Sequence, residues 1–326
     1  MTLSNSIDSE LDKLVGLAGA KRFVSKLAVG DLGVHAVLFY GPPGSGKSEL
    51  VRILTKAWLS NDPISTEPDR ACRAYERGNN PDVLSITPSA SSDQILIKQI
   101  REDEHPDKDD PVAVDTFLRS MPLMSRHKVV TITDAHRMNH RAANALLKSL
   151  EEPLPHGRFI LTTPSAGSVL PTILSRCLAV MCELPTVEEI VRQMGDFTPA
   201  ELALAENTPG RLREIFEHRD RYSELIEFAR ALPTKNHTSA LAVAEDFRDL
   251  TERLEPAFPG KERYAAAETL ERLGTLLSKD HRVPGEWTQA IIESHRRLKQ
   301  NGHEAIVTDA LFARLLRPKK GPRTGT

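Results

Sequence analysis

The sequence predicts an α/β domain with a parallel sheet, followed by domains that are entirely helical. Three observations carry this prediction. Short apolar runs alternate with amphipathic segments in the first half of the chain. One of these runs leads into a helix through the glycine-rich sequence G-P-P-G-S-G-K-S at residues 41–48, and strand signals disappear after Leu184 and Pro185. Alternating strands and helices with such a strand-to-helix loop are typical of a parallel sheet covered on both faces.

The elements of the first half follow from their residue patterns. Ala36–Tyr40 is a short apolar run before a glycine-rich turn, which indicates a buried parallel strand, and a helix follows from Lys47 to about Leu59. Residues 141–151 have apolar side chains at i, i+3, i+4 and i+7, which predicts an amphipathic helix that Pro153 ends. The other predictions are strands at Val83–Ile86, Lys128–Thr133, Phe159–Thr163 and Leu178–Cys182, and a helix at Gln94–Arg101.

The sequence pattern of the second half of the chain predicts helices. Residues 186–216 predict about three short helices, separated at Thr198-Pro199 and at Thr208-Pro209-Gly210. After about residue 220 the helices are longer, with interruptions at 256–260 and at 284–285. We therefore expect three domains, at residues 1–184, 185–217 and 218–326. Within the first, residues 102–124 predict a surface loop that becomes partly helical. The basic end, residues 317–326, predicts a disordered, solvated tail rather than a nucleic-acid contact.

Bulk composition narrows the class of protein. At roughly 100–200 residues per domain, 326 residues predict two or three domains. The chain lacks a run of about 18 apolar residues that could span a membrane, and polar residues 1–13 do not resemble a secretory signal. Three cysteines are too few for a disulfide framework, so we expect a reducing cytoplasm. The net charge of −2 argues against a broad DNA-binding face, so any DNA contact should be local or made by partners.

The glycine-rich loop has the composition of a phosphate-binding site. Its glycines let backbone N–H groups turn inward around phosphate oxygens, Lys47 can reach the outer phosphates, and the Ser48 hydroxyl can ligate Mg²⁺. The following helix points its positive end at the anion. The alternative is a loop that has kept this sequence and lost binding. The predicted nucleotide-binding residues of the loop are Gly41, Pro42, Pro43, Gly44, Ser45, Gly46, Lys47 and Ser48.

The acidic motif that would complete a hydrolytic site is only half present. Asp134 ends an apolar run, where a carboxylate that coordinates Mg²⁺ belongs in such ATPases; the alternative is an aspartate that caps the next turn. The next residue is Ala135, and the side chain of His136 should point elsewhere. Because loss of a general base costs about 10²–10⁴-fold in rate, we expect nucleotide binding with little hydrolysis.

Three longer runs carry a family resemblance. They read A-A-N-A-L-L-K-S-L-E-E-P at 142–153, F-I-L-T-T at 159–163 and L-P-T-I-L-S-R-C at 170–177. Together they resemble the bacterial DNA polymerase III clamp loader family of AAA+ proteins, and are similar to both its gamma/tau and its delta-prime subunits. The resemblance implies an AAA+ P-loop module with a parallel sheet, a small helical lid at 185–217 and an all-helical, oligomerising collar at 218–326.

The resemblance also implies residue roles. Residues 41–48 match the Walker A loop and Asp134 the Walker B aspartate, so Ser48 and Asp134 are the expected Mg²⁺ contacts. Thr163 matches the sensor 1 position, with Thr162 as the adjacent candidate.

Two arginines complete the set. Arg176 matches the arginine finger, which in this family reaches a neighbouring subunit's ATP, and Arg213 matches the sensor 2 arginine of the lid. Without the resemblance, Arg176 reads as an arginine that satisfies carbonyls at a helix end, and Arg213 as an ordinary arginine of a helix surface.

Two departures from the family pattern favour the delta-prime type and exclude zinc. Gamma-type subunits carry an Asp-Glu pair where this chain has Asp134 and Ala135. The family's four-cysteine zinc module is reduced here to Cys72. A structural zinc site needs four ligands, so we predict no zinc and an ordinary thiol.

The resemblance thus implies a stator subunit that binds ATP or ADP with Mg²⁺ and supplies Arg176 in trans. Its expected partners are gamma/tau and delta subunits, the sliding clamp and, through the complex, primed DNA, with no membrane. The alternatives are an ATP-hydrolysing motor of the gamma/tau type and a P-loop regulatory switch unrelated to the clamp.

Overall fold

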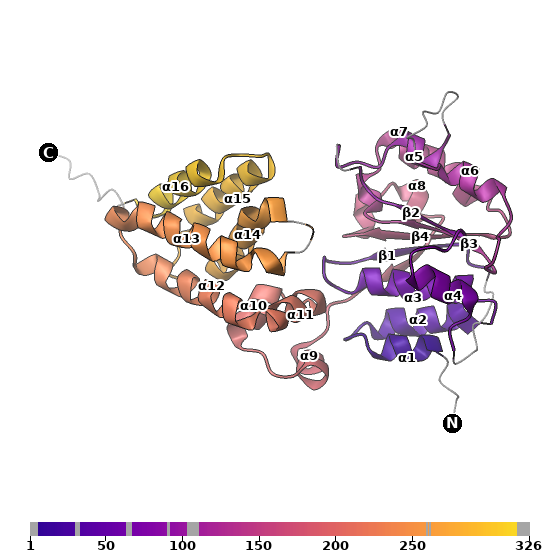
Figure 1. Ribbon diagram of the computed structural model, residues 1–326, viewed down its shortest axis with the longest axis horizontal. Helices are drawn as coiled ribbons and strands as arrows, with labels where there is room; N and C mark the ends of the chain where they lie inside the picture. Colours follow the sequence, from indigo (N-terminus) through magenta and orange to yellow (C-terminus); the bar gives the residue numbers. More distant parts are fainter. Residues whose placement is uncertain are drawn as a thin grey trace. The chain divides into compact units, whose positions relative to one another are not determined.

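The computed structural model divides the chain into two compact units, Met1–Met194 and Gly195–Thr326 (Figure 1). It describes residues 6–29, 33–62, 67–89, 92–102, 111–258, 260 and 262–317. The predicted disordered tail lies outside these residues from position 318 onward. The division into three domains with the boundaries given above stays a prediction.

A parallel sheet forms the centre of the first unit. Across the described residues its five strands run in the order β2-β3-β4-β1-β5, and every neighbouring pair is parallel. All the predicted strands are found, with ends within two residues of those expected. The strands are β1 Ala36–Tyr40, β2 Val83–Ile86, β3 Lys128–Ile132, β4 Gly157–Thr163 and β5 Leu178–Met181.

Helices cover both faces of this sheet (Figure 1). The first face carries α1 Ser6–Asp12, α2 Ala18–Val29, α3 Lys47–Leu59 and α4 Arg70–Glu76. The opposite face carries α5 Ile97–Ile100, α6 Val114–Arg119, α7 His140–Glu151 and α8 Pro171–Leu174. Because both faces are covered, β1 and β4 are buried along nearly their whole length.

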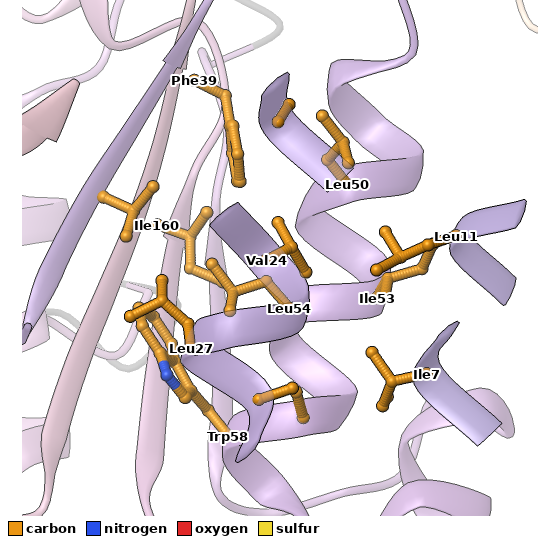
Figure 2. Close-up of a cluster of buried hydrophobic side chains, with 14 of the residues drawn as sticks. Ile7, Leu11, Val24, Leu27, Phe39, Leu50, Ile53, Leu54, Trp58 and Ile160 are labelled. Carbon is orange, nitrogen blue, oxygen red and sulfur yellow. The ribbon is translucent and has the colours of Figure 1, made fainter. Parts of the chain in front are cut away.

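The glycine-rich loop is anchored through the core of the first face. Phe39 and Ile160 project from the sheet toward Leu50 and Leu54 of α3, and all four are fully buried (Figure 2). Side chains of α1 and α2 pack in the same cluster, with Leu27 of α2 near Trp58 and Ile160 (Figure 2). The opposite face has its own buried cluster, in which Leu150 of α7 meets residues of β1, β3, β4 and α8. The two clusters hold α3 and α7 against the same sheet from opposite sides.

One predicted helix is shorter than expected. Gln94–Arg101 was expected to be helical, but only Ile97–Ile100 forms a helix. The backbone of Ile95 is already engaged in a parallel bridge: its N–H donates to the carbonyl of Arg137 at 3.0 Å, and its own carbonyl accepts from Asn139 N–H at 3.1 Å. This long-range pairing excludes a helix start before Leu96.

One helix of the second unit begins at a capping box that is visible in the sequence. Thr198 and Glu201 form a capping box, in which each side chain accepts a hydrogen bond from the other residue's N–H, and Pro199 takes the first helical position. The observed helices are α9 Val187–Met194 in the first unit and, in the second, α10 Pro199–Ala205, α11 Pro209–Glu217, α12 Arg219–Ala231, α13 Ala240–Leu254, α14 Ala265–Ser278, α15 Gly285–Lys299 and α16 Glu304–Leu315.

An aromatic cluster forms part of the core of the second unit. The rings of Phe228, Phe247 and Phe312 lie 5.4 to 6.1 Å apart between centroids and join α12, α13 and α16. Throughout the described ranges, no helix combines the length and the apolar character needed to cross a bilayer.

A buried lysine joins three elements on the α3 face. The ammonium of Lys56 lies 2.5 Å from a carboxylate oxygen of Glu10 and 2.5 Å from one of Glu76, and its side chain is only 4% exposed. Arg52 contacts the other oxygen of Glu10 at 2.7 Å. Burial by itself raises the pKa of Glu10, but the hydrogen bonds from Lys56 and Arg52 outweigh it, so the pKa is lowered. Removing Glu10 would leave the buried ammonium with one carboxylate fewer.

We predict that Glu10→Gln lowers the free energy of unfolding at neutral pH by about 1–3 kcal/mol, because a buried charge loses a partner. The folded-state pKa of Glu10 is lowered, so its contribution is complete above the ordinary value of 4.5 and is lost as the pH falls through the folded-state value. Urea unfolding at several pH values measures this. The deficit of the variant should shrink on acidification, whereas Glu49→Gln, at a 43% exposed side chain, should change stability little. A deficit independent of pH would contradict the prediction.

Candidate functional site

The glycine-rich loop leaves the carboxyl end of β1 and enters α3 at Lys47. Gly41, Gly44 and Gly46 have positive φ angles of 153°, 75° and 91°, in the region that favours glycine. At Gly41, a β-carbon would lie 2.3 Å from the carbonyl oxygen of Cys182, which follows β5. The path of the loop therefore depends on glycine both for backbone conformation and for space.

Lys47 is folded back over the loop. Its ammonium donates hydrogen bonds to the carbonyl oxygens of Gly41 at 2.6 Å and Pro42 at 2.7 Å. Burial lowers the pKa of Lys47, and the neighbouring Cys182 and Asp134 act in the opposite direction. Lys47 follows the loop that leaves the carboxyl end of β1, and Asp134 follows the carboxyl end of β3 in the same parallel sheet. The structure thus brings together the predicted phosphate-binding lysine and the predicted magnesium-binding carboxylate.

Two serines of the loop region offer hydroxyl groups to a ligand. The hydroxyl of Ser45 is buried, and within the described part of the chain it has no hydrogen-bond partner. A buried hydroxyl without a partner costs about 1–3 kcal/mol, which a phosphate oxygen would recover by accepting a hydrogen bond from it. Ser48 is exposed in the first turn of α3, as a magnesium ligand would require. The residues present therefore fit a nucleotide phosphate.

Asp134 lies just beyond β3 with a left-handed backbone, φ 55° and ψ 50°. Asp and Asn adopt this conformation more readily than most residues. Its backbone N–H donates to the hydroxyl of Thr162 at 3.1 Å, and the Nε atom of Arg137 lies 3.8 Å from its carboxylate. The half-buried carboxylate thus stands at the carboxyl end of the strands, on the same edge of the sheet as the loop.

Of the two residues after Asp134, Ala135 has no group that could act as a general base, and the role of His136 stays a prediction. Ala135 is 2% exposed and belongs to the apolar cluster on the α7 face. The Nδ1 atom of His136 is buried and, among the described residues, lacks a hydrogen-bond partner. Asp134 is therefore the carboxylate that this segment offers to the loop.

The two threonines at the end of β4 point to opposite faces of the sheet. Thr162 is paired with Phe39, whose side chain lies in the α3 cluster, so Thr162 faces the side of the phosphate loop. The hydroxyl of Thr163 faces the other side, 2.7 Å from the hydroxyl of Ser168 and 3.2 Å from the carbonyl oxygen of Ser165. The assignment of Thr163 to sensor 1 stays a prediction, and the geometry favours its neighbour Thr162.

Arg176 lies just after α8, which packs in the cluster on the α7 face. Its Nη1 donates to the carbonyl oxygen of Thr172 at 2.9 Å and to the hydroxyl of Ser175 at 3.2 Å. Its Nη2 lies 2.5 Å from a carboxylate oxygen of Glu151, and the arginine side chain remains 33% exposed. Reasoning from the sequence found Arg176 and missed Glu151. The sequence did contain one signal for Glu151: it places a negative charge at the carboxyl end of a helix, where the helix dipole disfavours it.

Arg213 and Cys72 complete the predicted set. Arg213 is an exposed residue of α11 in the second unit, so its role stays a prediction. Burial raises the pKa of Cys72 to about 12, with Asp69 adding to the shift, and a protonated thiol is a poor zinc ligand. No three His, Cys, Asp or Glu side chains gather as a metal site in the described ranges. The absence of zinc stays a prediction.

Comparisons with known proteins agree with the resemblance. Residues 19–185 match the family described as DNA polymerase III, delta subunit. The chain is 30% identical over 230 residues to the DNA polymerase III subunit delta' of Pseudomonas aeruginosa, a match covering 66% of each protein. It is 31% identical over 182 residues to the DNA polymerase III subunit gamma of Buchnera aphidicola, covering 54% of this chain and 46% of that protein. The chain thus spans less than two thirds of the length of either relative.

Among solved structures, the chain resembles a DNA polymerase III gamma subunit-related protein from Thermotoga maritima, with a TM-score of 0.51 at 20% identity over 90% of this chain and 99% of that one. At this identity the likeness shows the fold alone. Together with the parallel sheet, it confirms the predicted fold class, an AAA+ P-loop module followed by helices.

We predict that Gly41→Ala lowers the free energy of unfolding by about 2–3 kcal/mol and abolishes nucleotide binding, because the added methyl group would overlap the carbonyl of Cys182. Thermal unfolding and titration with a fluorescent ATP analogue measure the two effects. Gly19→Ala is the matched control, since that exposed glycine of α2 has open space around its β-carbon. Unchanged stability and affinity in Gly41→Ala would contradict the prediction.

Proposed function

The chain belongs to the DNA polymerase III clamp loader family of AAA+ proteins, and on this premise we propose that it is a delta-prime-like subunit of such a loader. It binds ATP or ADP with Mg²⁺, hydrolyses little of it, and supplies Arg176 to the nucleotide of a neighbouring subunit. It acts in the cytoplasm with gamma/tau and delta subunits, and helps to load the sliding clamp on primed DNA.

The buried Ala135 carries this proposal. The position after Asp134 is occupied by a methyl group packed in an apolar cluster, where a hydrolytic site needs a carboxylate to polarise water. Without that base the chemical step is slower by about 10²–10⁴-fold. A subunit that retains its phosphate loop without this base is suited to bind nucleotide and to leave hydrolysis to its neighbours.

Different residues of the loop bind different parts of the nucleotide. The backbone N–H groups of Gly44 and Gly46 and the ammonium of Lys47 bind phosphate oxygens, and the Ser45 hydroxyl donates to another. The Ser48 hydroxyl and the Asp134 carboxylate hold Mg²⁺, which neutralises phosphate charge. To bind the phosphates, Lys47 exchanges its two carbonyl partners in the loop for phosphate oxygens.

Arg176 supplies chemistry that this chain cannot use alone. A guanidinium stabilises the charge that spreads over the equatorial oxygens of a transferred phosphoryl group. Arg176 lies on the face of the sheet that carries α7 and α8, whereas the phosphate loop leads into α3 on the opposite face. Its partly exposed side chain is available to a second subunit.

The complete phosphate loop also supports an alternative, the ATP-hydrolysing motor of the gamma/tau type. The Ser45 hydroxyl, which has no hydrogen-bond partner among the described residues, favours an occupied site in either case. In the motor proposal turnover depends on this loop, whereas in the stator proposal it does not. A regulatory switch unrelated to the clamp would form no stable complex with gamma/tau and delta subunits.

We predict that Arg176→Ala lowers ATP turnover at the facing subunit by about 10³-fold, because the arginine finger is lost. The measurement uses a reconstituted complex with gamma/tau and delta subunits in which only that facing site can bind ATP, stimulated by clamp and primed DNA. Assembly, followed by gel filtration, should be unchanged. Arg22→Ala, at an exposed position of α2, is the control. Full turnover by an assembled Arg176→Ala complex would show that the finger is assigned to the wrong residue.

We predict that Lys47→Ala weakens ATP binding to the isolated chain by at least roughly tenfold, because a charge-assisted contact worth about 1.5–3 kcal/mol disappears. Equilibrium titration with an ATP analogue measures this, with Lys26→Ala of α2 as the control. The reconstituted complex with all its other sites intact should keep most of its turnover. Complete loss of turnover would support the motor function instead.

A further inference from the structure

The guanidinium of Arg176 is held by contacts from two helices. Nη2 meets the carboxylate of Glu151, the last residue of α7, at 2.5 Å. Nη1 donates to the carbonyl oxygen of Thr172 in α8 at 2.9 Å and to the hydroxyl of Ser175 at 3.2 Å. The three contacts involve both terminal nitrogens, so they define the plane of the group as well as its position.

The backbone that carries these residues is anchored in the apolar cluster on the α7 face. Leu150, next to Glu151, is 1% exposed, and Ile173, next to Thr172, is fully buried in the same apolar cluster. Pro153 follows the end of α7, and Pro171 is the first residue of α8. With both helices anchored in one core, the orientation of Arg176 depends on its own side-chain torsions and on the contacts that restrain them.

Stability does not explain the carboxylate of Glu151. A negative charge at the carboxyl end of a 12-residue helix faces the negative end of the helix dipole, and Glu152 adds a second negative charge beside it. The paired side chains are 49% and 33% exposed, and ion pairs this accessible to water contribute little to folding. The position of this carboxylate instead allows its contact with Arg176.

The contacts hold the guanidinium without consuming it. An arginine has five N–H donors in one plane, and in the described part of the chain these contacts use three of them. The Nε donor and the second donor of Nη2 are left for incoming oxygen atoms. In this arrangement Arg176 can donate to a phosphate while it keeps its contacts with Glu151, Thr172 and Ser175.

We propose that Glu151 is a positioning residue for Arg176: through its contact with Nη2 it presents the remaining donors of the guanidinium to the phosphates bound by a neighbouring subunit. The inference rests on the proposed function, in which Arg176 acts in trans. Because a planar fork binds phosphate in a directed way, a loss of orientation lowers the rate even though the charge of the arginine is unchanged.

The test compares Glu151→Ala, Glu151→Gln and Glu152→Ala in the complex in which only the facing subunit can bind ATP. Glu151→Ala should lower kcat about tenfold, since small misplacements of a reacting group can cost up to 10²-fold. The KM for ATP, the melting temperature and assembly should stay unchanged. Glu151→Gln keeps an oxygen that can accept from Nη2, so its kcat should lie between those of Glu151→Ala and the wild type. Glu152→Ala, one residue away, should match the wild type.

Unchanged kcat in Glu151→Ala would overturn the proposal. Increased kcat would overturn it too, because Glu151 would then hold the arginine back. A loss shared equally by Glu152→Ala would also overturn it, because the effect would then come from local charge. The Arg176→Ala variant separates the positioning role of Glu151 from the proposed function of Arg176. If that variant keeps full turnover, the proposed function fails. If it loses turnover while Glu151→Ala does not, only the positioning role fails.

Discussion

The pairing of β1 with β4 is the constraint on which the candidate site depends. The register places Tyr40 beside Thr163 and Phe39 beside Thr162, and the N–H of Gly41 extends the pairing by donating to the carbonyl of Thr163 at 3.2 Å. The loop therefore starts at the edge of the sheet where β4 ends. Since β4 also pairs with β3, Asp134 emerges at the same edge. A shift in this register would separate the loop from its carboxylate.

The two faces of the sheet carry different parts of the proposed function. The α3 face anchors the phosphate loop, through the contacts that Phe39 and Ile160 make with α3. The α7 face carries Arg176 and Glu151 and also encloses Ala135. A carboxylate in place of Ala135 would have to be buried among apolar side chains, which is costly without a partner. The packing on this face thus disfavours a general base for any nucleotide bound at the chain's own loop.

Local signals in the sequence were sufficient for most elements of the first unit. The strands and α3 follow from apolar runs beside a glycine-rich turn, and α7 from its helical period, because these patterns report burial within a short window. The prediction was wrong where a distant segment competes for the backbone. Ile95 pairs with the segment after Asp134, so the helix expected over Gln94–Arg101 is reduced to Ile97–Ile100. Sequence periodicity carries no information about such a partner.

The sequence by itself determined the fold class, and it predicted the phosphate loop, the missing acid after Asp134 and the role of Arg176, because each depends on residue types at fixed spacing. Only the tertiary structure decided which side chains meet. It turned Thr162 toward the loop and Thr163 away, folded Lys47 onto the carbonyls of Gly41 and Pro42, and set Glu151 against Arg176. These outcomes depend on strand register and on the packing of α7 against α8, which bring together residues far apart in the chain.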